Sequence, residues 1–489
     1  MNPEPTLDYA SSHATADADR VSWRERIGLG FGRMVVDGTH GTLHVLINPV
    51  YVVTLGMSPA LISTVVFIQR LWDAMVDPFF GQYSDNFRSR WGRRRPMLLV
   101  GAIPVALLFT AIWWFPTGVG IPFLFSHLLL VSLAFYAAHS LFAMPLAGLT
   151  IEATDDYHER TKLAGVTLAF GFLAQVGSQW ILPLTRLKFF TNGISGVRWV
   201  SLGCGALFII AGLIPVLLCR ERMYKRVAVK QKRVGFWEGL RAVRGNQSFM
   251  TLLIARAIFS FGFNVVGLIG FYMYIYYVYG GDLDAASFNY AVIGSSYHIA
   301  AILTSLFVYP YLERLVGKSK TLQVAAAVML AGCVAKVFLY HPGWVWLPII
   351  VTITNGVANA GVSLMSSAML GDIADYDEWQ TGLRREGLFS SLLSWVDKAG
   401  NSLGSFLTGF ILVWIGFDKK FGAQAPLTLS LMKFSYVVAP GLGALVTFFL
   451  IQRYQLSRDQ MYEIKDELAR RRAAVANAPL AAPPPPLPC

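Results

Sequence analysis

Charged residues are scarce in this sequence: Asp, Glu, Lys and Arg make up 14% of its 489 residues, whereas soluble proteins carry about 25%. Cysteine is also scarce, and the four residues present have no metal-ligand spacing, which argues against a zinc site or a disulfide framework. The first 20 residues hold no apolar stretch, so we expect no cleaved signal peptide. No Ser/His/Asp constellation, nucleotide loop or metal cluster stands out. We therefore expect neither an enzyme nor a bound cofactor.

Long apolar blocks are what the sequence has instead. Hydrophobic residues make up 55% of the chain, and they fall in blocks of about 20 residues or more, the length that crosses a hydrocarbon core as a helix. Clear examples are Met97–Phe115, Val200–Cys219, Thr321–Tyr340 and Phe434–Ile451, and twelve such blocks can be counted. The pattern predicts an all-α polytopic membrane protein with twelve transmembrane helices.

Basic residues are concentrated in every second loop. The loops near residues 88–95, 220–244 and 314–320 are rich in Lys and Arg, whereas those near Gly56 and Pro342 have none. Cytoplasmic loops of membrane proteins carry such an excess. The net charge of +12 therefore indicates topology rather than a nucleic-acid partner. We expect a multi-pass protein of the cell (inner) membrane with both termini in the cytoplasm.

A long charged stretch divides the chain into two halves. The predicted parts are a cytoplasmic N-terminal segment at 1–27, a six-helix half at 28–219, a cytoplasmic central loop at 220–247, a second six-helix half at 248–453 and a largely disordered cytoplasmic tail at 454–489. The loop after the second block resembles the loop after the eighth, and the loop after the fourth resembles the loop after the tenth. These repeats favour a duplicated transporter whose halves rock around a site at the midplane.

Charged side chains interrupt the second block, in the stretch RLWDAMVDPFFG. Arg70, Asp73 and Asp77 share one helix face because residues four and seven apart recur on the same side. A charge at the bilayer centre costs about 2.5–3.5 kcal/mol on insertion scales, so these groups need partners or water. A static Arg70–Asp73 pair is one interpretation, but it leaves Asp77 without a partner. We favour a coupling-ion site, either for Na⁺, which prefers oxygen ligands, or for a proton shared by two nearby carboxylates.

A glycine-rich basic loop follows this block. Gly81 and Asp85, then Gly92, Arg93 and Arg94, resemble the signature loop between the second and third helices of the major facilitator superfamily. We expect it to act as a gate, with Asp85 at a helix end pairing with arginines at the cytoplasmic interface. The alternative is ordinary positive-inside charge, which would not need the two glycines or the aspartate.

Three motifs resemble one family within that superfamily. RLWDAMVDPFFG, DYHERTKLAG and GDIADYDEWQTGLRREGLFSSLLSWVDKAGNSLG together are similar to those of the glycoside–pentoside–hexuronide:cation symporters, over about Gly28 to Arg453. The resemblance implies the major facilitator fold, alternating access, and symport of a sugar or glycoside with Na⁺ or H⁺ by a protein expected to be a monomer in the lipid bilayer. It also implies that Asp73 and Asp77 are the cation ligands.

The resemblance also indicates substrate-binding residues. The sugar-binding acid of the family's first helix matches Asp37, and the lysine of its eleventh helix matches Lys398. A carboxylate accepts hydrogen bonds from sugar hydroxyls and an ammonium donates them, although each residue could instead form a structural ion pair, for example Lys398 with Asp73 or Asp77. Trp395 lies near Lys398 in the sequence and could stack on a sugar ring or simply pack.

The fourth helix departs from the galactoside-specific members of the family. Their aspartate and tryptophan are replaced by Ala143 and Ala147, while Ser140 keeps an oxygen that a cation could use. Half of a galactoside pocket is therefore absent. A cation-coupled transporter of an amphipathic solute, such as a lysolipid, is the alternative to a sugar carrier. An uncoupled channel is a further alternative.

Overall fold

The computed structural model of this protein describes residues 20–87, 89, 92–154, 157–219, 221, 245–382, 386–418 and 424–476. Every regular element in these ranges is a helix. Their bounds are α1 Trp23–Ile47, η1 Asn48–Thr54, α2 Pro59–Asn86, α3 Arg95–Ala111, α4 Ile121–Ile151, α5 Tyr157–Thr185, α6 Gly193–Leu218, α8 Gln247–Tyr272, η2 Met273–Val278, α9 Leu283–Leu303, η3 Thr304–Val308, α10 Tyr309–Val316, α11 Lys318–Leu339, α12 Pro348–Thr381, α13 Glu386–Trp414, α14 Pro426–Ile451 and α15 Arg458–Ala476. The η segments are π-helical turns that continue the helix before them.

The helices make six membrane-length units in each half. Within the described residues, nine helical runs are long and apolar enough to cross a membrane, and α3 is a shorter apolar helix. The more polar α1 and α13 complete the set. When each η segment and α10 are joined to the helix that they continue, α1–α6 give six units and α8–α14 give six more. The predicted fold class is thus confirmed.

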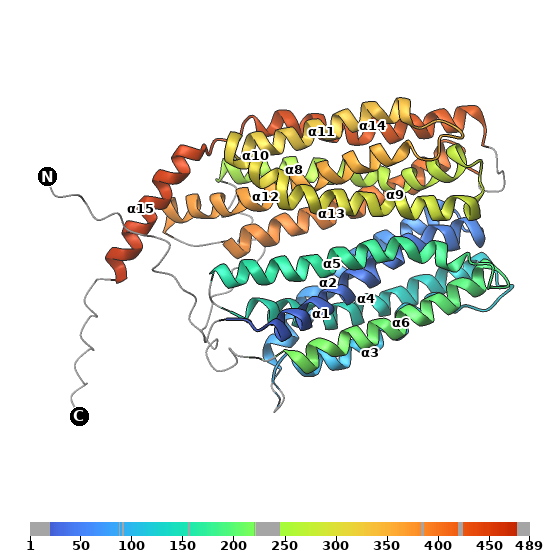
Figure 1. The fold of residues 1–489 in the computed structure, drawn as a ribbon, viewed down its shortest axis with the longest axis horizontal. Coiled ribbons are helices and arrows are strands. Elements are labelled where there is room, and N and C mark those ends of the chain that lie inside the picture. Colours follow the sequence, from blue (N-terminus) through green and yellow to red (C-terminus); the bar gives the residue numbers. More distant parts are fainter. Residues whose placement is uncertain are drawn as a thin grey trace.

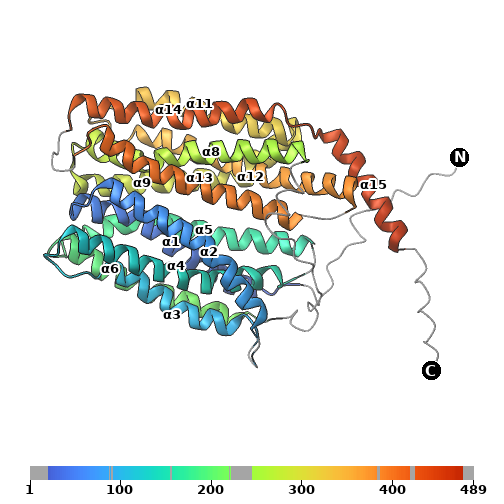
Figure 2. The ribbon, with the colours of Figure 1, turned by 180° about the vertical axis from the view of Figure 1, so that it is seen from behind.

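The two sets of six helices lie side by side as two bundles (Figure 1). Contacts between α2 and α13 and between α5 and α9 join them. We call them the N-half (α1–α6) and the C-half (α8–α14). The helix α15 lies at one end of the molecule, which we call the terminal end, and the opposite end is the distal end (Figure 2). Most of the predicted central loop and residues 477–489 of the tail fall outside the described residues, whereas Arg458–Ala476, in the tail that was predicted to be largely disordered, forms the helix α15. The domain limits stay predictions.

Local sequence explains where several helices begin. At the start of α1, the Ser22 hydroxyl accepts a hydrogen bond from the Glu25 amide (3.3 Å), and the Glu25 carboxylate accepts one from the Ser22 amide (3.2 Å). This reciprocal pair satisfies two of the four amides that a helix start leaves unpaired. Other membrane helices begin with proline in the first turn, including α2, α4, α12 and α14. Proline suits that position because its missing N–H would have had no helical partner.

Glycines let neighbouring helices approach closely. A Cβ on Gly262 of α8 would lie 3.2 Å from the Cα of Gly443 in α14. Between the halves, a Cβ on Gly409 of α13 would lie 2.2 Å from the Ser63 hydroxyl and 2.6 Å from the Pro59 carbonyl oxygen of α2. Small residues are typical of such interfaces because membrane helices associate by close packing. Only glycine therefore fits at the α2–α13 contact without a shift of the helices.

The halves meet at the distal end. The Tyr272 hydroxyl of α8 donates a hydrogen bond to the Asn48 side-chain oxygen of η1 at 3.2 Å, and both residues are buried. Arg186, after α5, forms an ion pair with Asp284 of α9 at 3.1 Å. Each contact links the N-half to the C-half. Together with the α2–α13 contact at Gly409, they close this end of the interface.

Candidate functional site

The two aspartates of the second membrane helix meet a lysine from the other half. Lys398 Nζ of α13 lies 2.6 Å from Asp77 Oδ2 and 3.3 Å from Asp73 Oδ2 of α2. The Asp73 and Asp77 side chains are 9% and 17% exposed, whereas that of Lys398 is 37% exposed. The structure therefore brings together three of the predicted site residues. It pairs Asp73 with Lys398, which was one of the structural alternatives considered for the lysine.

Ser140 is the third side chain that brings oxygen to this group. We call the group the ion cluster (Asp73, Asp77, Ser140 and Lys398). Its buried hydroxyl, on α4, donates to Asp77 Oδ1 at 2.7 Å. Two carboxylates and one ammonium leave a net charge of −1, and the oxygens are hard ligands of the kind that alkali cations prefer. Within the described residues, no group of three or more His, Cys, Asp or Glu side chains could hold a metal ion. The cluster thus suits a monovalent cation or a proton.

The helix α13 presents opposite charges in opposite directions. Asp397 Oδ1 accepts hydrogen bonds from Arg256 Nε and from the Ser260 hydroxyl of α8, both at 2.7 Å. Lys398, the next residue, points to the N-half. Because Asp397 holds α13 to its own half, Lys398 is carried by the C-half as a whole. Any relative movement of the halves therefore changes the distance between Lys398 and the two aspartates.

Asp37 lies in a different contact. Its carboxylate receives a hydrogen bond from Arg33 Nε, one turn earlier in α1, at 2.7 Å. A Cβ on Gly171 of α5 would lie 2.2 Å from Asp37 Oδ2, so the carboxylate packs directly against that helix. The side chain keeps 20% exposure, which leaves room for a ligand. Trp395 is 52% exposed, and its predicted stacking role stays a prediction, as does the sugar-binding role of Asp37.

A buried histidine lies between these two groups of acids. His139, beside Ser140 on α4, is within electrostatic range of Asp37, Asp73 and Asp77. Its Nε2 lies 3.3 Å from a backbone carbonyl oxygen in α1, so this nitrogen carries the hydrogen in that contact. Its Nδ1 is buried and has no hydrogen-bond partner in the described part of the chain. In this tautomer Nδ1 carries a lone pair that no described residue uses.

The predicted gate arginines bind a carboxylate of their own half. Arg94 contacts Glu152, at the end of α4, with Nη2 at 2.6 Å and Nε at 3.0 Å, and Arg93 pairs with the same residue. The Arg94 guanidinium passes over Gly148, where a Cβ would lie 1.3 Å from Nη1. The Asp85 side chain lies outside the described residues, so its predicted pairing is not observed. The gating role of these residues stays a prediction.

A second carboxylate orders the start of α3. Glu221 accepts hydrogen bonds from the backbone amides of residues 93, 94 and 95 at 2.7, 2.7 and 2.8 Å. Gly92 precedes them with φ +106°, a conformation that favours glycine, and a Cβ there would lie 2.6 Å from the Glu221 carboxylate. Gly81, by contrast, has open space around it. The structure thus gives a steric reason for one glycine of the predicted motif and none for the other.

A cavity of about 250 Å³ lies between the halves. His44 and Gln179 line it from the N-half, and α8, α9, α11, α12 and α14 line it from the C-half. Gln179 Nε2 lies 3.4 Å from His298 Nε2 across the interface. A cavity with walls from both halves is the arrangement that alternating access requires.

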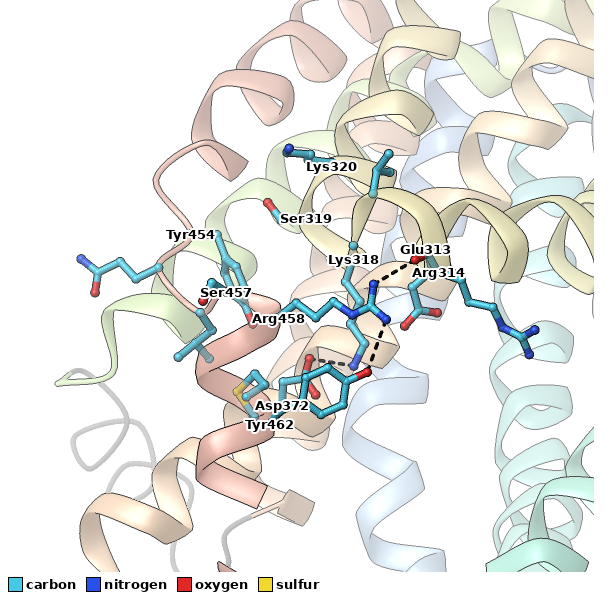
Figure 3. A pocket seen from close by; sticks show the side chains of 15 residues that line it. Glu313, Arg314, Lys318, Ser319, Lys320, Asp372, Tyr454, Ser457, Arg458 and Tyr462 are labelled. Carbon is cyan, nitrogen blue, oxygen red and sulfur yellow. Dashed lines mark hydrogen bonds and ion pairs between the residues drawn. The ribbon is translucent and has the colours of Figure 1, made fainter. Parts of the chain in front are cut away.

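A larger cavity of about 440 Å³ lies at the terminal end, between α10, α11, α12 and α15 (Figure 3). Lys318 forms an ion pair with Asp372 at 2.7 Å, and Arg458 of α15 donates to the Arg314 carbonyl oxygen at 2.9 Å. Burial, and then the nearby Asp372 carboxylate, raises the pKa of the Tyr454 phenol above its ordinary value. Because the described residues that line it belong to the C-half, to α15 or to the segment that joins α14 to α15, movement between the halves would not open this cavity.

Two charged features were missed from the sequence. The Arg256–Asp397 pair links α8 to α13. An arginine and an aspartate in separate apolar blocks could have indicated this pair. Lys336 is 1% exposed and lines the central cavity. A single lysine inside the apolar block Thr321–Tyr340 could have indicated this residue.

Known proteins match this chain over most of its length. The isoprimeverose transporter of Lactiplantibacillus pentosus is 24% identical over 444 residues, covering 88% of each chain. The glucuronide carrier protein homolog of Escherichia coli (strain K12) is 23% identical over 464 residues, covering 93% of this chain and 97% of the relative. In structure, the nucleoside transporter NupG aligns with a TM-score of 0.62 over 88% of this chain and 99% of that one, at 15% identity, and thus shares the fold. The family described as MFS/sugar transport protein matches residues 28–458. The twelve-helix chain, with its charged cluster between two halves, belongs to this transporter family.

Proposed function

We propose that this protein is a symporter that moves a sugar or glycoside together with Na⁺ or H⁺ by alternating access, and that it catalyses no covalent reaction. The observation that carries the proposal is the position of Lys398 Nζ, 2.6 Å from Asp77 and 3.3 Å from Asp73. An ammonium from one half occupies the place between two carboxylates of the other half that a coupling cation would take. The names of the two relatives, an isoprimeverose transporter and a glucuronide carrier homolog, support a sugar-type solute.

Ion binding exchanges one positive charge for another. A monovalent cation bound by Asp73, Asp77 and Ser140 compensates one of the two carboxylate charges and occupies the oxygens that Lys398 contacts, so the attraction between Lys398 and α2 weakens and the lysine can leave. A proton on Asp77 would weaken the same contact. In both cases the interaction between α2 and α13 depends on whether the ion is present. This dependence is the physical requirement for coupling, because a ligand shifts a conformational equilibrium only by its differential affinity for the two states.

The conformation described here is interpreted as inward-facing. The contacts that link Asn48 to Tyr272 and Arg186 to Asp284 close the distal end. The basic loops place the terminal end, with α15, on the cytoplasmic side under the positive-inside rule. Both termini are then cytoplasmic in the cell membrane, and the solute is released toward the terminal end. We expect a monomer, because one chain supplies both halves and both sets of ligands.

The central cavity favours a small solute over a lysolipid. Its volume of about 250 Å³ lies slightly below the roughly 300 Å³ at which drug-sized pockets begin. Tyrosine hydroxyls and amide groups line it, and these groups form hydrogen bonds with hydroxyls. Asp37, 20% exposed on α1, is not among the described residues that line this cavity, so as an acceptor for solute hydroxyls it would belong to a separate part of the solute path.

Uptake into proteoliposomes under an imposed Na⁺ or proton gradient tests the proposal. We expect Asp73→Asn and Asp77→Asn each to abolish uphill accumulation while facilitated exchange of solute persists. Asp372→Asn is the matched control, because it removes a carboxylate of α12 that binds Lys318 instead of Lys398. Uphill uptake at the wild-type rate in both site variants would show that the ion binds elsewhere. Flux that never exceeds the downhill limit in the wild type would indicate a channel.

A further inference from the structure

The wall of the central cavity contains a buried lysine. Lys336 of α11 is 1% exposed. Its Nζ donates to the Tyr436 carbonyl oxygen at 3.2 Å and lies 4.2 Å from the centre of the Tyr436 ring. None of the described residues that line the cavity is Asp or Glu. The same nitrogen lies 4.0 Å from Cys333 Sγ, and because an ammonium can donate three hydrogen bonds, one donor and a positive charge remain for a ligand.

Polar groups around Lys336 suit a hydroxylated partner. Tyr340 and Tyr436 share a hydrogen bond at 3.1 Å beside the lysine. Asn355, also in the wall, has a buried side-chain oxygen with no hydrogen-bond partner within the described chain. A buried acceptor without a partner is costly unless a ligand or water supplies a donor. A solute hydroxyl at this position would satisfy it.

A purely structural role explains Lys336 less well. The lysine does link α11 to α14, but a buried charge is weak evidence for stability, since hydrophobic replacements are often as stable or more so. Lys433 of α14 makes the same kind of link, donating to the Tyr340 carbonyl oxygen at 3.2 Å and lying 5.5 Å from the Tyr277 ring. Lys433 does not line the cavity. The two lysines therefore separate the structural contribution from the contribution of a charge in the cavity wall.

We infer that the central cavity binds a hydroxylated organic anion of monosaccharide size, with Lys336 as the counter-ion of its acidic group. The inference rests on the proposed transport function and specifies its substrate class. The acidic group is a carboxylate or a sulfonate, because both carry one negative charge and accept hydrogen bonds from an ammonium. The hydroxyls of the solute face Asn355 and the tyrosines, and Gln179 and His44 close the cavity from the N-half.

Three methyl glycosides with the same glucose ring test this inference. They differ only in the substituent on C5, which is a hydroxymethyl, a carboxylate or a sulfomethyl group. Binding to the purified full-length protein is measured by calorimetry at pH 7.5, with and without Na⁺. We expect at least one anion to bind ten- to a hundredfold more tightly than the neutral glycoside, which is the range that one charged hydrogen bond supplies. Lys336→Met should remove this preference, Lys336→Arg should keep most of it, and Lys433→Met should leave it unchanged.

Several outcomes would overturn the inference. These are equal binding of the neutral glycoside and both anions by the wild type, binding of neither anion, and an unchanged anion preference in Lys336→Met. The wild-type comparison decides even where Lys336→Met fails to fold. The dependence on Na⁺ or on pH is scored separately with Asp77→Asn. Anion preference without any ion dependence would reject coupling and keep the substrate class. Ion dependence without anion preference would keep coupling and reject the substrate class.

Discussion

Replacing Lys398 by methionine should increase the affinity of the protein for its coupling cation. The substitution keeps most of the side-chain volume but removes the charge that lies 2.6 Å from Asp77 and 3.3 Å from Asp73. The two carboxylates and the Ser140 hydroxyl remain in place. If the lysine competes with the cation, the variant loses the competitor and keeps the ligands. An increase in affinity distinguishes this reasoning from a general loss of function.

The size of the effect follows from the two contacts. A hydrogen bond between charged groups contributes about 1.5–3 kcal/mol, and the contact at 2.6 Å is the shorter of the two. Because Lys398 is 37% exposed, solvent screens the attraction, and we count the two contacts together as one such bond. The change in cation affinity is then roughly ten- to a hundredfold.

Thermal unfolding of the purified variant measures this change. Without Na⁺ at pH 7.5, Lys398→Met should unfold at a lower temperature than the wild type, because two acids on one helix turn have lost their counter-charge. Added Na⁺ should restore stability at a concentration ten- to a hundredfold lower than the wild type requires, since a ligand that binds only the folded state stabilises it by mass action. If the coupling ion is a proton, lowering the pH should replace Na⁺. Lys433→Met is the control for removal of a membrane lysine.

An unchanged or weaker response of Lys398→Met to both Na⁺ and protons would refute the reasoning. In that case the lysine would not occupy the cation position, and its contacts with the two aspartates would be structural. The uptake assay gives a second check. Coupling should be lost in this variant even though the ion binds more tightly, because the contact that senses the ion is absent.

Three further predictions concern other parts of the molecule. Asp37→Ala should weaken solute binding ten- to a hundredfold through loss of charged hydrogen bonds while ion binding without solute persists; the reverse pattern would place Asp37 in the ion site. Gly148→Ala should slow turnover and lower the unfolding temperature, because its Cβ would lie 1.3 Å from a guanidinium nitrogen, whereas Gly81→Ala, with open space around it, should match the wild type in both measurements. Gly409→Ala should separate α13 from α2, because the added Cβ would lie 2.2 and 2.6 Å from atoms of α2. The labelling of Asn48→Cys by a membrane-impermeant thiol reagent should therefore rise. Unchanged labelling would contradict the closed distal end.

The fold could be predicted from the sequence because the bilayer imposes a simple length rule. Blocks of about 20 apolar residues must be helices, since no water is available in the bilayer core to satisfy an open backbone. The rule worked for most blocks, including those that contain proline, such as α4 with Pro145. It was less direct for α1 and α13, whose polar side chains leave them outside the set of clearly apolar spans. Both were nevertheless counted among the twelve apolar blocks.

The sequence could predict only the part of the site that lies on a single helix. The spacing of Asp73 and Asp77 placed both acids on one face of α2 because helix geometry is local. Whether Lys398 approached them depended on the packing of α2 against α13, which no local pattern encodes. The same reason explains why Glu152 was not foreseen as the partner of Arg94, since the two are 58 positions apart. Lys336 was different, because an isolated lysine in an apolar block is by default a candidate functional residue.

The location of the positive charge on the opposite half is what makes coupling physically reasonable. If the counter-charge of Asp73 and Asp77 were on α2 itself, ion binding would rearrange one helix and leave the interface unchanged. Lys398 is instead attached to the C-half, because the neighbouring Asp397 binds Arg256 of α8. Without the ion, the charge of Lys398 therefore attracts the C-half to the N-half, and a bound ion weakens that attraction. By linkage, any solute that stabilises one arrangement of the halves must change ion affinity by the same factor as the ion changes solute affinity.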